Sequence, residues 1–289
     1  MMTKHQKKKN TGIQIPRFII NIGKFIQFFS PTLAAKYARL LFQKPMKHNT
    51  PKREKPWEAS AEIQYLAIPN IGKSVAVYKW GQGDKKALVV HGWSGRATQL
   101  YKIIEGLLAE GYEVYSFDAP AHGKSTGKTT MMPEYVKTIQ KISEVYGPFD
   151  IAIGHSMGGI SLLITEGERP TFKKLVIMGA PDSIYDIFHN FIKRMELKPV
   201  VADRLIDIFE SVTGKPIFDY HGSKQTAKIK VPVLIIHDEN DQEVPINDAI
   251  NNYKQLENGQ LLKTKGLGHN RILKDPEVIK TIVDFVNKD

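Results

Sequence analysis

The chain of 289 residues contains no cysteine. This absence excludes a disulfide scaffold, a zinc site built on thiolates and a cysteine nucleophile. Long apolar runs are also missing, because Lys24 interrupts the most apolar stretch near the N-terminus. A bilayer span needs about 20 mostly apolar residues, and a signal peptide needs an unbroken apolar region before its cleavage site. We therefore expect neither, and we expect a cytoplasmic protein.

Acidic residues are scarce at one end of the chain. Residues 1–60 hold 13 Lys and Arg but only two acids, Glu54 and Glu58, whereas residues 61–289 hold 28 of each sign. The whole net charge of +11 therefore belongs to an N-terminal arm, residues 1–60, and the remaining body is neutral. A nucleic-acid-binding domain needs its own basic face, so we expect no nucleic-acid partner.

The N-terminal arm contains two helical patterns. Across residues 16–30 the apolar side chains recur three or four apart and predict one apolar helix face; they are Phe18, Ile19, Ile22, Phe25, Ile26 and Phe29. Ser30-Pro31 predicts the N-cap and first turn of a second helix, which runs through Leu41. Residues 43–57 are polar and contain proline, which predicts a linker.

Two interpretations of this arm follow from its pattern. In the first, the helices pack on the body and their lysines face water. In the second, residues 1–45 lie on an anionic membrane as a peripheral, basic amphipathic segment. We favour the first, because packing on the same protein is the commoner use of an amphipathic helix.

From residue 61 onward, short apolar runs alternate with helical patterns. Two runs flank Asn70-Ile71-Gly72 and predict a β-hairpin. Six later runs predict strands: 87–91, 113–117, 149–154, 174–179, 231–237 and 260–265. Five helical stretches accompany them: 97–110, 133–146, 157–166, 245–256 and 276–287. This alternation predicts an α/β fold with a mostly parallel sheet covered by helices on both faces.

One long segment, residues 181–228, separates two of these strands. It is far longer than a normal connection and carries helical patterns at 183–194 and 200–212. We interpret it as a small helical cap over the carboxyl edge of the sheet, where ligands bind in open α/β folds. The alternative is an extra packing layer with no part in binding.

The segment Gly154-His155-Ser156-Met157-Gly158 lies between a predicted strand and a predicted helix. A Gly-x-Ser-x-Gly sequence at such a junction forms a nucleophile elbow, in which a strained turn projects the serine hydroxyl above the sheet. The glycines lack Cβ atoms and let strand and helix approach closely. The alternative is that Ser156 is only an N-cap, which the flanking glycines disfavour.

A serine nucleophile on such a fold needs an acid and then a histidine further along the chain. An acidic loop containing Asp238 and Asp241 follows the predicted strand 231–237, and His269 follows a glycine-rich turn after strand 260–265. Both segments lie where the remaining members of a catalytic triad are expected.

Over roughly residues 61–289 the chain resembles the α/β-hydrolase family. The resemblance rests on Gly154–Gly158, Asp241, His269, His91-Gly92-Trp93 and Asp118–Ser125, the last with Ala121 where the family commonly has glycine. It implies an α/β-hydrolase fold in which Ser156 is the nucleophile, His269 the general base and then acid, and Asp241 the carboxylate that orients His269.

The resemblance also ranks the competing residues. Relatives carry the acid three residues after the position of Asp238 and before a Val-Pro pair, which favours Asp241 and leaves Asp238 and His237 without an assigned role. The backbone N–H groups of Trp93 and Met157 are the implied oxyanion hole. The resemblance makes His122 a scaffold residue rather than a second base.

The implied activity is hydrolysis of an acyl ester or thioester through an acyl-enzyme, with a small-molecule acyl substrate and no metal or organic cofactor. Amide or peptide hydrolysis and acyl transfer are alternatives on the same triad, and a non-catalytic binding protein is the alternative of another class. The oligomeric state stays open. Because the triad candidates lie beyond residue 150, we expect deletion of residues 1–45 to leave hydrolysis of a small soluble ester nearly unchanged.

Overall fold

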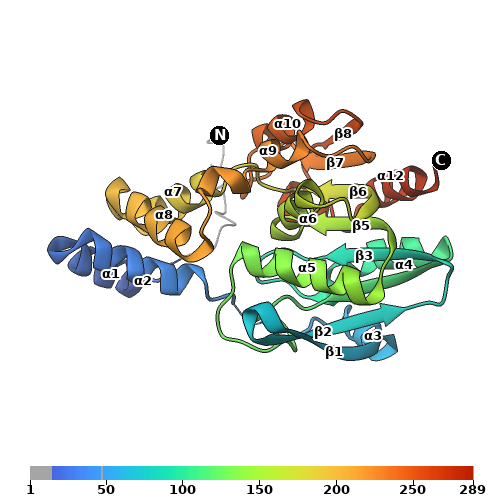
Figure 1. Ribbon diagram of the computed structural model, residues 1–289, viewed down its shortest axis with the longest axis horizontal. Coiled ribbons are helices and arrows are strands. Elements are labelled where there is room, and N and C mark those ends of the chain that lie inside the picture. Colours follow the sequence, from blue (N-terminus) through green and yellow to red (C-terminus); the bar gives the residue numbers. More distant parts are fainter. Residues whose placement is uncertain (1–14, 47, 289) are drawn as a thin grey trace, which may run out of the picture.

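A twisted sheet forms the centre of the computed structural model, which describes residues 15–46 and 48–288 (Figure 1). Within these residues the sheet has eight strands in the order β1-β2-β4-β3-β5-β6-β7-β8. The strands are β1 (Glu62–Ile68), β2 (Lys73–Trp80), β3 (Lys85–Val90), β4 (Tyr112–Phe117), β5 (Phe149–His155), β6 (Phe172–Met178), β7 (Val233–Asp238) and β8 (Gly259–Thr264). β2 pairs antiparallel with β1 and β4, and the neighbours from β4 to β8 pair in parallel. The predicted hairpin and mostly parallel sheet are confirmed.

Helices cover both faces of this sheet. Residues of β3 alternate between the two, because successive side chains of a strand point to opposite faces. The helices and 3₁₀ turns of the body are α3 (Lys55–Ser60), η1 (Pro69–Ile71), η2 (Ala97–Leu100), α4 (Tyr101–Ala109), α5 (Met132–Tyr146), α6 (Met157–Glu168), α10 (Ile246–Lys254), α11 (Gly268–Arg271) and α12 (Pro276–Asn287). Leu88 and Val90 join the cluster under α5, α6 and α10, whereas Ala87 and Val89 join the cluster under α4 and α12.

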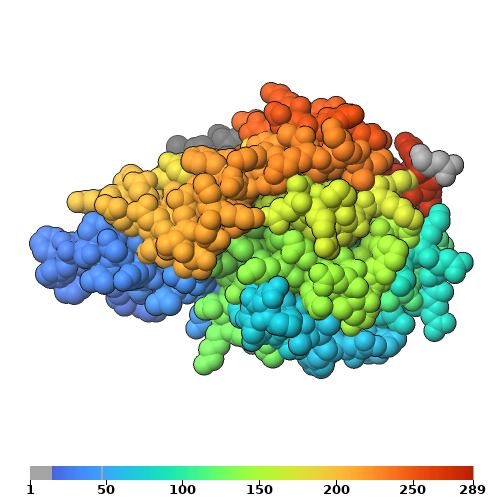
Figure 2. Space-filling view, viewed as in Figure 1, coloured from blue at the N-terminus to red at the C-terminus, as the bar shows by residue number. Residues whose placement is uncertain are grey.

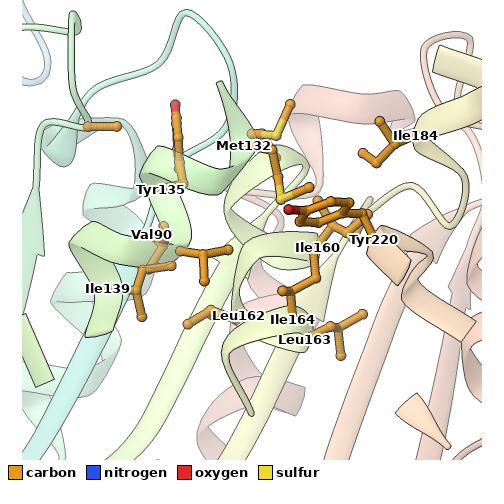
Figure 3. Close-up of a cluster of buried hydrophobic side chains, with 14 of the residues drawn as sticks. Val90, Met132, Tyr135, Ile139, Ile160, Leu162, Leu163, Ile164, Ile184 and Tyr220 are labelled. Carbon is orange, nitrogen blue, oxygen red and sulfur yellow. The ribbon is translucent and has the colours of Figure 1, made fainter. Parts of the chain in front are cut away.

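The long segment between β6 and β7 is helical. It contains α7 (Ile184–Arg194), α8 (Pro199–Thr213), η3 (Ile217–Tyr220) and α9 (Gly222–Thr226). Figure 3 shows how it joins the core: Ile184 and Tyr220 lie in the same buried cluster as Ile160 and Ile164 of α6. The segment is therefore anchored to the helix that begins at the predicted nucleophile.

The two N-terminal helices, α1 (Arg17–Phe29) and α2 (Pro31–Phe42), pack against this inserted segment. Ser30 caps α2 as expected, since its Oγ accepts a hydrogen bond from the Leu33 N–H at 3.2 Å. α2 lies along α8, and Arg17 and Lys24 of α1 each reach Glu196 at 2.5 Å. Figures 1 and 2 show these four helices gathered at one end of the molecule. We call α1, α2, α7 and α8 the four-helix group.

The apolar face predicted for α1 is only partly covered. Ile20 and Gly23 are buried, but Phe18, Phe25 and Phe29 are each about two-thirds exposed, at 65%, 68% and 68%. The expectation that the whole apolar face packs on the body is therefore wrong for these aromatic residues. α1 is apolar on two sides, and periodicity alone did not distinguish the inner from the outer side. In the part of the chain that the structure describes, no helix combines the length and apolar content required to cross a membrane.

Part of the predicted linker, residues 43–57, is instead tied to the body through Glu54. Glu54 is 1% exposed and accepts hydrogen bonds from Arg96 Nη1 at 2.7 Å and from Thr98 Oγ1 at 3.1 Å. A buried carboxylate requires such partners, because desolvation of an unpaired charge is costly. α3 begins at Lys55, directly after this ion pair.

Candidate active site

Ser156 stands at the junction between β5 and α6. Its backbone has φ 53° and ψ −119°, a strained conformation for a residue with a side chain. The turn is possible only with small neighbours: a Cβ atom on Gly154 would lie 2.7 Å from the Gly158 carbonyl oxygen, and one on Gly158 would overlap the Val90 carbonyl. The local sequence therefore folds as a strand–turn–helix elbow that holds Ser156 at the carboxyl edge of the sheet.

Asp241 and His269 meet at the same edge from two further loops. The Nδ1–H of His269 donates to Asp241 Oδ2 at 2.7 Å. The other carboxylate oxygen, Oδ1, accepts the N–H groups of Glu243 at 2.8 Å and Val244 at 3.0 Å. The carboxylate is thus fixed by its own loop and holds the imidazole in the tautomer whose Nε2 carries no proton. Ser156 and His269 line one cavity, and the Ser156 hydroxyl has no hydrogen-bond partner among the described residues.

Opposing effects set the ionisation of this pair. Burial of the His269 imidazole lowers its pKa, but the hydrogen bond and charge of Asp241, together with the charge of Glu243, outweigh burial and raise the pKa above its ordinary value. Burial raises the pKa of Asp241, yet the bond to His269 and the two backbone N–H donors bring it below its ordinary value. The aspartate is therefore ionised, and the His269 imidazole keeps its proton to higher pH than a free imidazole would.

Glu243 provides a test of this electrostatic balance. Its Oε2 lies 4.0 Å from His269 Nε2 and stabilises the imidazolium. We predict that His269 is the general base, which must be neutral to accept a proton, so kcat/KM is expected to fall as pH drops through the His269 pKa. The attraction between the Glu243 carboxylate and the imidazolium is worth about 1 kcal/mol in water, and dissolved salt reduces it. Glu243→Gln removes this attraction and should move the acidic limb of the kcat/KM profile to lower pH by roughly half a unit.

The matched control is Glu239→Gln. Glu239 lies in the same acidic loop and is exposed, but the structure gives its side chain no contact with His269. We expect its pH profile of kcat/KM to overlay that of the unsubstituted protein. A profile for Glu243→Gln that moves to higher pH, or not at all, contradicts the assignment of Glu243 as a charge that raises the His269 pKa.

Asp238 and His237 shape the loops around this pair. Asp238 Oδ2 accepts hydrogen bonds from Thr264 Oγ1 at 2.8 Å and from the Leu267 N–H at 2.9 Å. It therefore joins the end of β7 to the turn that presents His269. His237 Nε2 donates to the Val244 carbonyl at 2.9 Å and so joins the end of β7 to the acidic loop. Neither role could be assigned from the sequence.

His155 also supports His269, and this role could not be predicted from the sequence. Its Nε2–H donates to the His269 carbonyl at 2.9 Å, and the two rings lie 4.6 Å apart between centroids. Complete burial, reinforced by the His269 charge, lowers the pKa of His155 to about 3, so this ring stays neutral. It occupies a variable position of the elbow motif, and nothing in the local pattern signals a partner 114 residues away.

The two residues implied for an oxyanion hole flank Ser156 from different loops. Trp93 follows β3, and Met157 opens α6. Within the described ranges, 15–46 and 48–288, neither backbone N–H donates to a protein acceptor. Both donors therefore remain available for an oxyanion, and the Met157 N–H also belongs to the positive end of the α6 dipole.

Hydrogen bonds of His122 and Asp118 hold together the loops that follow β3 and β4. His122 is 2% exposed, its Nδ1–H donates to the Pro120 carbonyl at 3.0 Å, and its Nε2 accepts the Ser94 N–H at 3.0 Å. Asp118 accepts the N–H groups of Ala97 and Lys124, both at 2.8 Å. Ala121, which stands where relatives commonly have glycine, keeps the left-handed backbone of that position with φ 67°.

A sequence model of the alpha/beta hydrolase family matches residues 87–280, which is most of the body and includes the elbow, the acidic loop and His269. The chain belongs to the alpha/beta hydrolase family. YugF, an uncharacterised hydrolase of Bacillus subtilis, is 24% identical over 273 residues, covering 79% of this chain and 99% of the relative. A non-heme chloroperoxidase of Streptomyces lividans is 23% identical over 264 residues, covering 72% and 94%.

Solved structures of this family show the same fold. Est1E from Butyrivibrio proteoclasticus, solved with ferulic acid, aligns with a TM-score of 0.58 at 19% identity, over 77% of this chain and 96% of its own. A membrane phospholipase A described as a bacterial virulence factor aligns with a TM-score of 0.63 at 14% identity. That alignment covers 94% of this chain and 97% of the phospholipase, so the likeness reaches into the N-terminal arm.

Two adjoining cavities lie near the elbow in this member of the family, and Ser156 lines the first of them. The first, about 390 Å³, contains Ser156 and His269 and is rimmed by Arg53, Arg96 and Lys274. The second, about 340 Å³, is mainly apolar and lies between the N-terminal helices and α7. Met46, Trp93 and Glu243 line both cavities, so the two meet at these residues.

The N-terminal arm supplies much of the wall of both cavities. Ile15, Ile19 and Phe42 line the apolar cavity, and Met46 and His48 line the polar one. Deletion of residues 1–45 would therefore remove one side of the apolar cavity. Nearly unchanged hydrolysis of a small soluble ester after this deletion stays a prediction. This contact could not be predicted from the sequence, because β1 and β2 separate the arm from β3 and from the loop that carries Trp93.

Proposed function

We propose that this protein is a serine hydrolase that cleaves carboxylic esters or thioesters of apolar acyl chains. The observation that carries the proposal is the strained elbow of Ser156 in one cavity with His269, whose Nδ1–H is bonded to a buried aspartate at 2.7 Å. This order along the chain, the shared cavity and the His269–Asp241 bond support a Ser–Asp–His triad on the family's fold.

The mechanism assigns one task to each group. Ser156 Oγ attacks the acyl carbonyl while His269 Nε2 takes its proton, and Asp241 stabilises the resulting imidazolium. The oxyanion accepts the N–H groups of Trp93 and Met157, and stabilisation of this kind is usually the largest catalytic term. His269 then protonates the departing alcohol or thiol. Water, deprotonated by the same imidazole, releases the acid and restores Ser156.

The two cavities divide the substrate between them. The apolar cavity, with Phe42, Ile187 and Phe191 in its wall, suits an acyl chain. The polar cavity, with Arg53 and Lys274 at its rim, suits the leaving group and the attacking water. Trp93 lies at their junction, where the acyl carbonyl must stand to reach both Ser156 and the oxyanion donors.

The substrate assignment predicts a dependence on acyl length. With p-nitrophenyl esters from acetate to dodecanoate, kcat/KM should rise by up to about fourfold per added methylene until the apolar cavity is filled, because each buried methylene is worth about 0.8 kcal/mol. Ile187→Trp adds bulk to the wall of the cavity and should flatten this rise while leaving acetate turnover nearly unchanged.

Val200→Trp is the matched control for that substitution. Val200 lies on α8, is 37% exposed and lines neither cavity, so the same kind of change there should leave the length profile intact. If the protein hydrolysed the acetate ester but kcat/KM did not rise for longer acyl chains, the acyl-chain assignment would be refuted. The serine mechanism would not be affected by this result. An unchanged profile in Ile187→Trp would refute the location of the acyl site.

A further inference from the structure

The outer side of α1 carries an unusually large apolar surface. Ile22 is 45% exposed and Phe28 84% exposed, and the three phenylalanines named above complete the patch. We call Phe18, Ile22, Phe25, Phe28 and Phe29 the outer patch. It is continuous, because the ring centroids of Phe25 and Phe28 each lie 5.2 Å from that of Phe29. Single exposed apolar side chains are common, but a contiguous aromatic patch marks an interaction surface.

The outer patch is not a poorly packed core face. The opposite side of the same helix is well packed: Ile20 is buried, and a Cβ on Gly23 would already contact Leu197 and Tyr37 at 3.4 and 3.5 Å. The inner side of α1 is therefore packed against the rest of the four-helix group. The exposed phenylalanines lie on its other side, and Figure 1 shows α1 at one end of the molecule.

The charge of the surrounding segment identifies the partner. The described residues 15–46 and 48–53 contain seven Lys and Arg and no Asp or Glu. Glu196 partly neutralises Arg17 and Lys24, but Lys36 on α2 is exposed and the described residues show no acid beside it. An anionic lipid surface attracts such a segment, at about 1 kcal/mol for each Lys or Arg close to it. A second copy of this chain would instead bring two basic arms together, which like-charge repulsion disfavours.

The position of α1 links this surface to the cavities. Ile15, Pro16 and Ile19, at the start of the same helix, line the apolar cavity that meets the Ser156 cavity at Trp93. A surface that receives the outer patch therefore lies close to the wall of the proposed acyl site. Phe25 and Phe29 themselves line neither cavity, so membrane contact and acyl binding use different residues of one helix.

We propose that the outer patch of α1 docks the protein on the surface of an anionic phospholipid bilayer, with the phenylalanines inserted at the headgroup boundary and the basic side chains of α1 and α2 on the lipid charges. This reverses the preference drawn from sequence alone, because the structure leaves exposed the aromatic face that was expected to pack. Docking extends the proposed function by placing the acyl site beside lipid. It does not depend on catalysis, so each can fail without the other.

The test is co-sedimentation of the full-length protein with vesicles of phosphatidylcholine alone or with 30% phosphatidylglycerol. We expect binding to the anionic vesicles that weakens when NaCl is raised from 0.1 to 0.5 M, as the Debye length shrinks. In the double variant Phe25→Ser/Phe29→Ser, binding should fall at least tenfold, because each phenylalanine withdrawn from an apolar environment weakens affinity by roughly that factor.

The control variant is Tyr65→Ser/Val145→Ser, which removes two large apolar side chains that are 62% and 46% exposed elsewhere on the body. It should bind vesicles like the unsubstituted protein. Both double variants change exposed residues and should keep the thermal midpoint and the rate on p-nitrophenyl acetate. If the unsubstituted protein bound anionic vesicles but did not hydrolyse p-nitrophenyl acetate, the proposed hydrolase activity would be refuted and the docking proposal would stand.

Three outcomes overturn the docking proposal. The first is a full-length protein that does not bind anionic vesicles. The second is equal binding by Phe25→Ser/Phe29→Ser and the unsubstituted protein. The third is a dimer, detected by sedimentation equilibrium without lipid, that the same double variant dissociates; this result would assign the outer patch to a second copy of the chain.

Discussion

Ser156→Ala is expected to lower kcat for p-nitrophenyl esters by roughly 10⁴ to 10⁶, the scale observed when a member of a serine triad is removed. Alanine keeps the backbone of the elbow but removes the atom that forms the acyl-enzyme. The remaining rate should reflect binding and the oxyanion donors alone. The measurement is kcat at saturating ester, with circular dichroism to show that the variant is folded.

Ser161→Ala is the control for this substitution. Ser161 lies on the same helix, and its hydroxyl donates to the Met157 carbonyl at 2.7 Å, so it cannot act as a nucleophile. Its kcat should stay within about tenfold of the unsubstituted protein. If Ser156→Ala retained full activity, the elbow would be a structural turn and hydrolysis would have to occur elsewhere.

Asp241→Asn should lower kcat by about 10⁴, far more than Asp238→Asn. An asparagine amide donates to His269 Nδ1 and forces the proton onto Nε2, the atom that must accept it from Ser156. The same change of tautomer costs about this factor in the serine-protease template. Asp238 acts on the loops instead, because its carboxylate is bonded to Thr264 and Leu267 and does not touch His269.

Asp238→Asn and Asp241→Asn should also differ in their effect on thermal stability. Asp238→Asn should lower the thermal midpoint, because it weakens a buried acceptor of several N–H and O–H groups, while kcat falls by roughly tenfold or less. Asp241→Asn should keep most of its stability and lose its activity. The opposite ranking of kcat would assign the orienting carboxylate to Asp238 and contradict the reading of the 2.7 Å contact.

Much of the fold was predictable because it depends on local pattern. Period-two alternation and short apolar runs indicate strands, and each predicted strand of the body is present in the sheet. Gly154 and Gly158 were informative for a specific reason: a Cβ atom at either position would strike backbone. The choice of Asp241 over Asp238 came from the family resemblance, and the structure places Asp241, not Asp238, against His269.

The rest of the site depends on contacts between segments that are distant in the sequence. The buried pair of Glu54 and Arg96 spans 42 residues, and the pattern around Glu54 is that of an ordinary polar loop. His155 supports His269 through a carbonyl, a contact that any residue type at position 269 could make. The outer side of α1 resembled a packing face because apolar spacing does not show which side of a helix meets the protein.

The most direct test of the serine mechanism is reaction of the full-length protein with a fluorophosphonate, followed by intact mass and peptide mapping. We predict one adduct per chain, located on Ser156, with labelling slowed below the pKa of His269 and abolished in Ser156→Ala. Stoichiometric labelling of another residue with Ser156 unmodified would contradict the account. The absence of any adduct, with no turnover of esters, would favour a binding protein on the hydrolase fold.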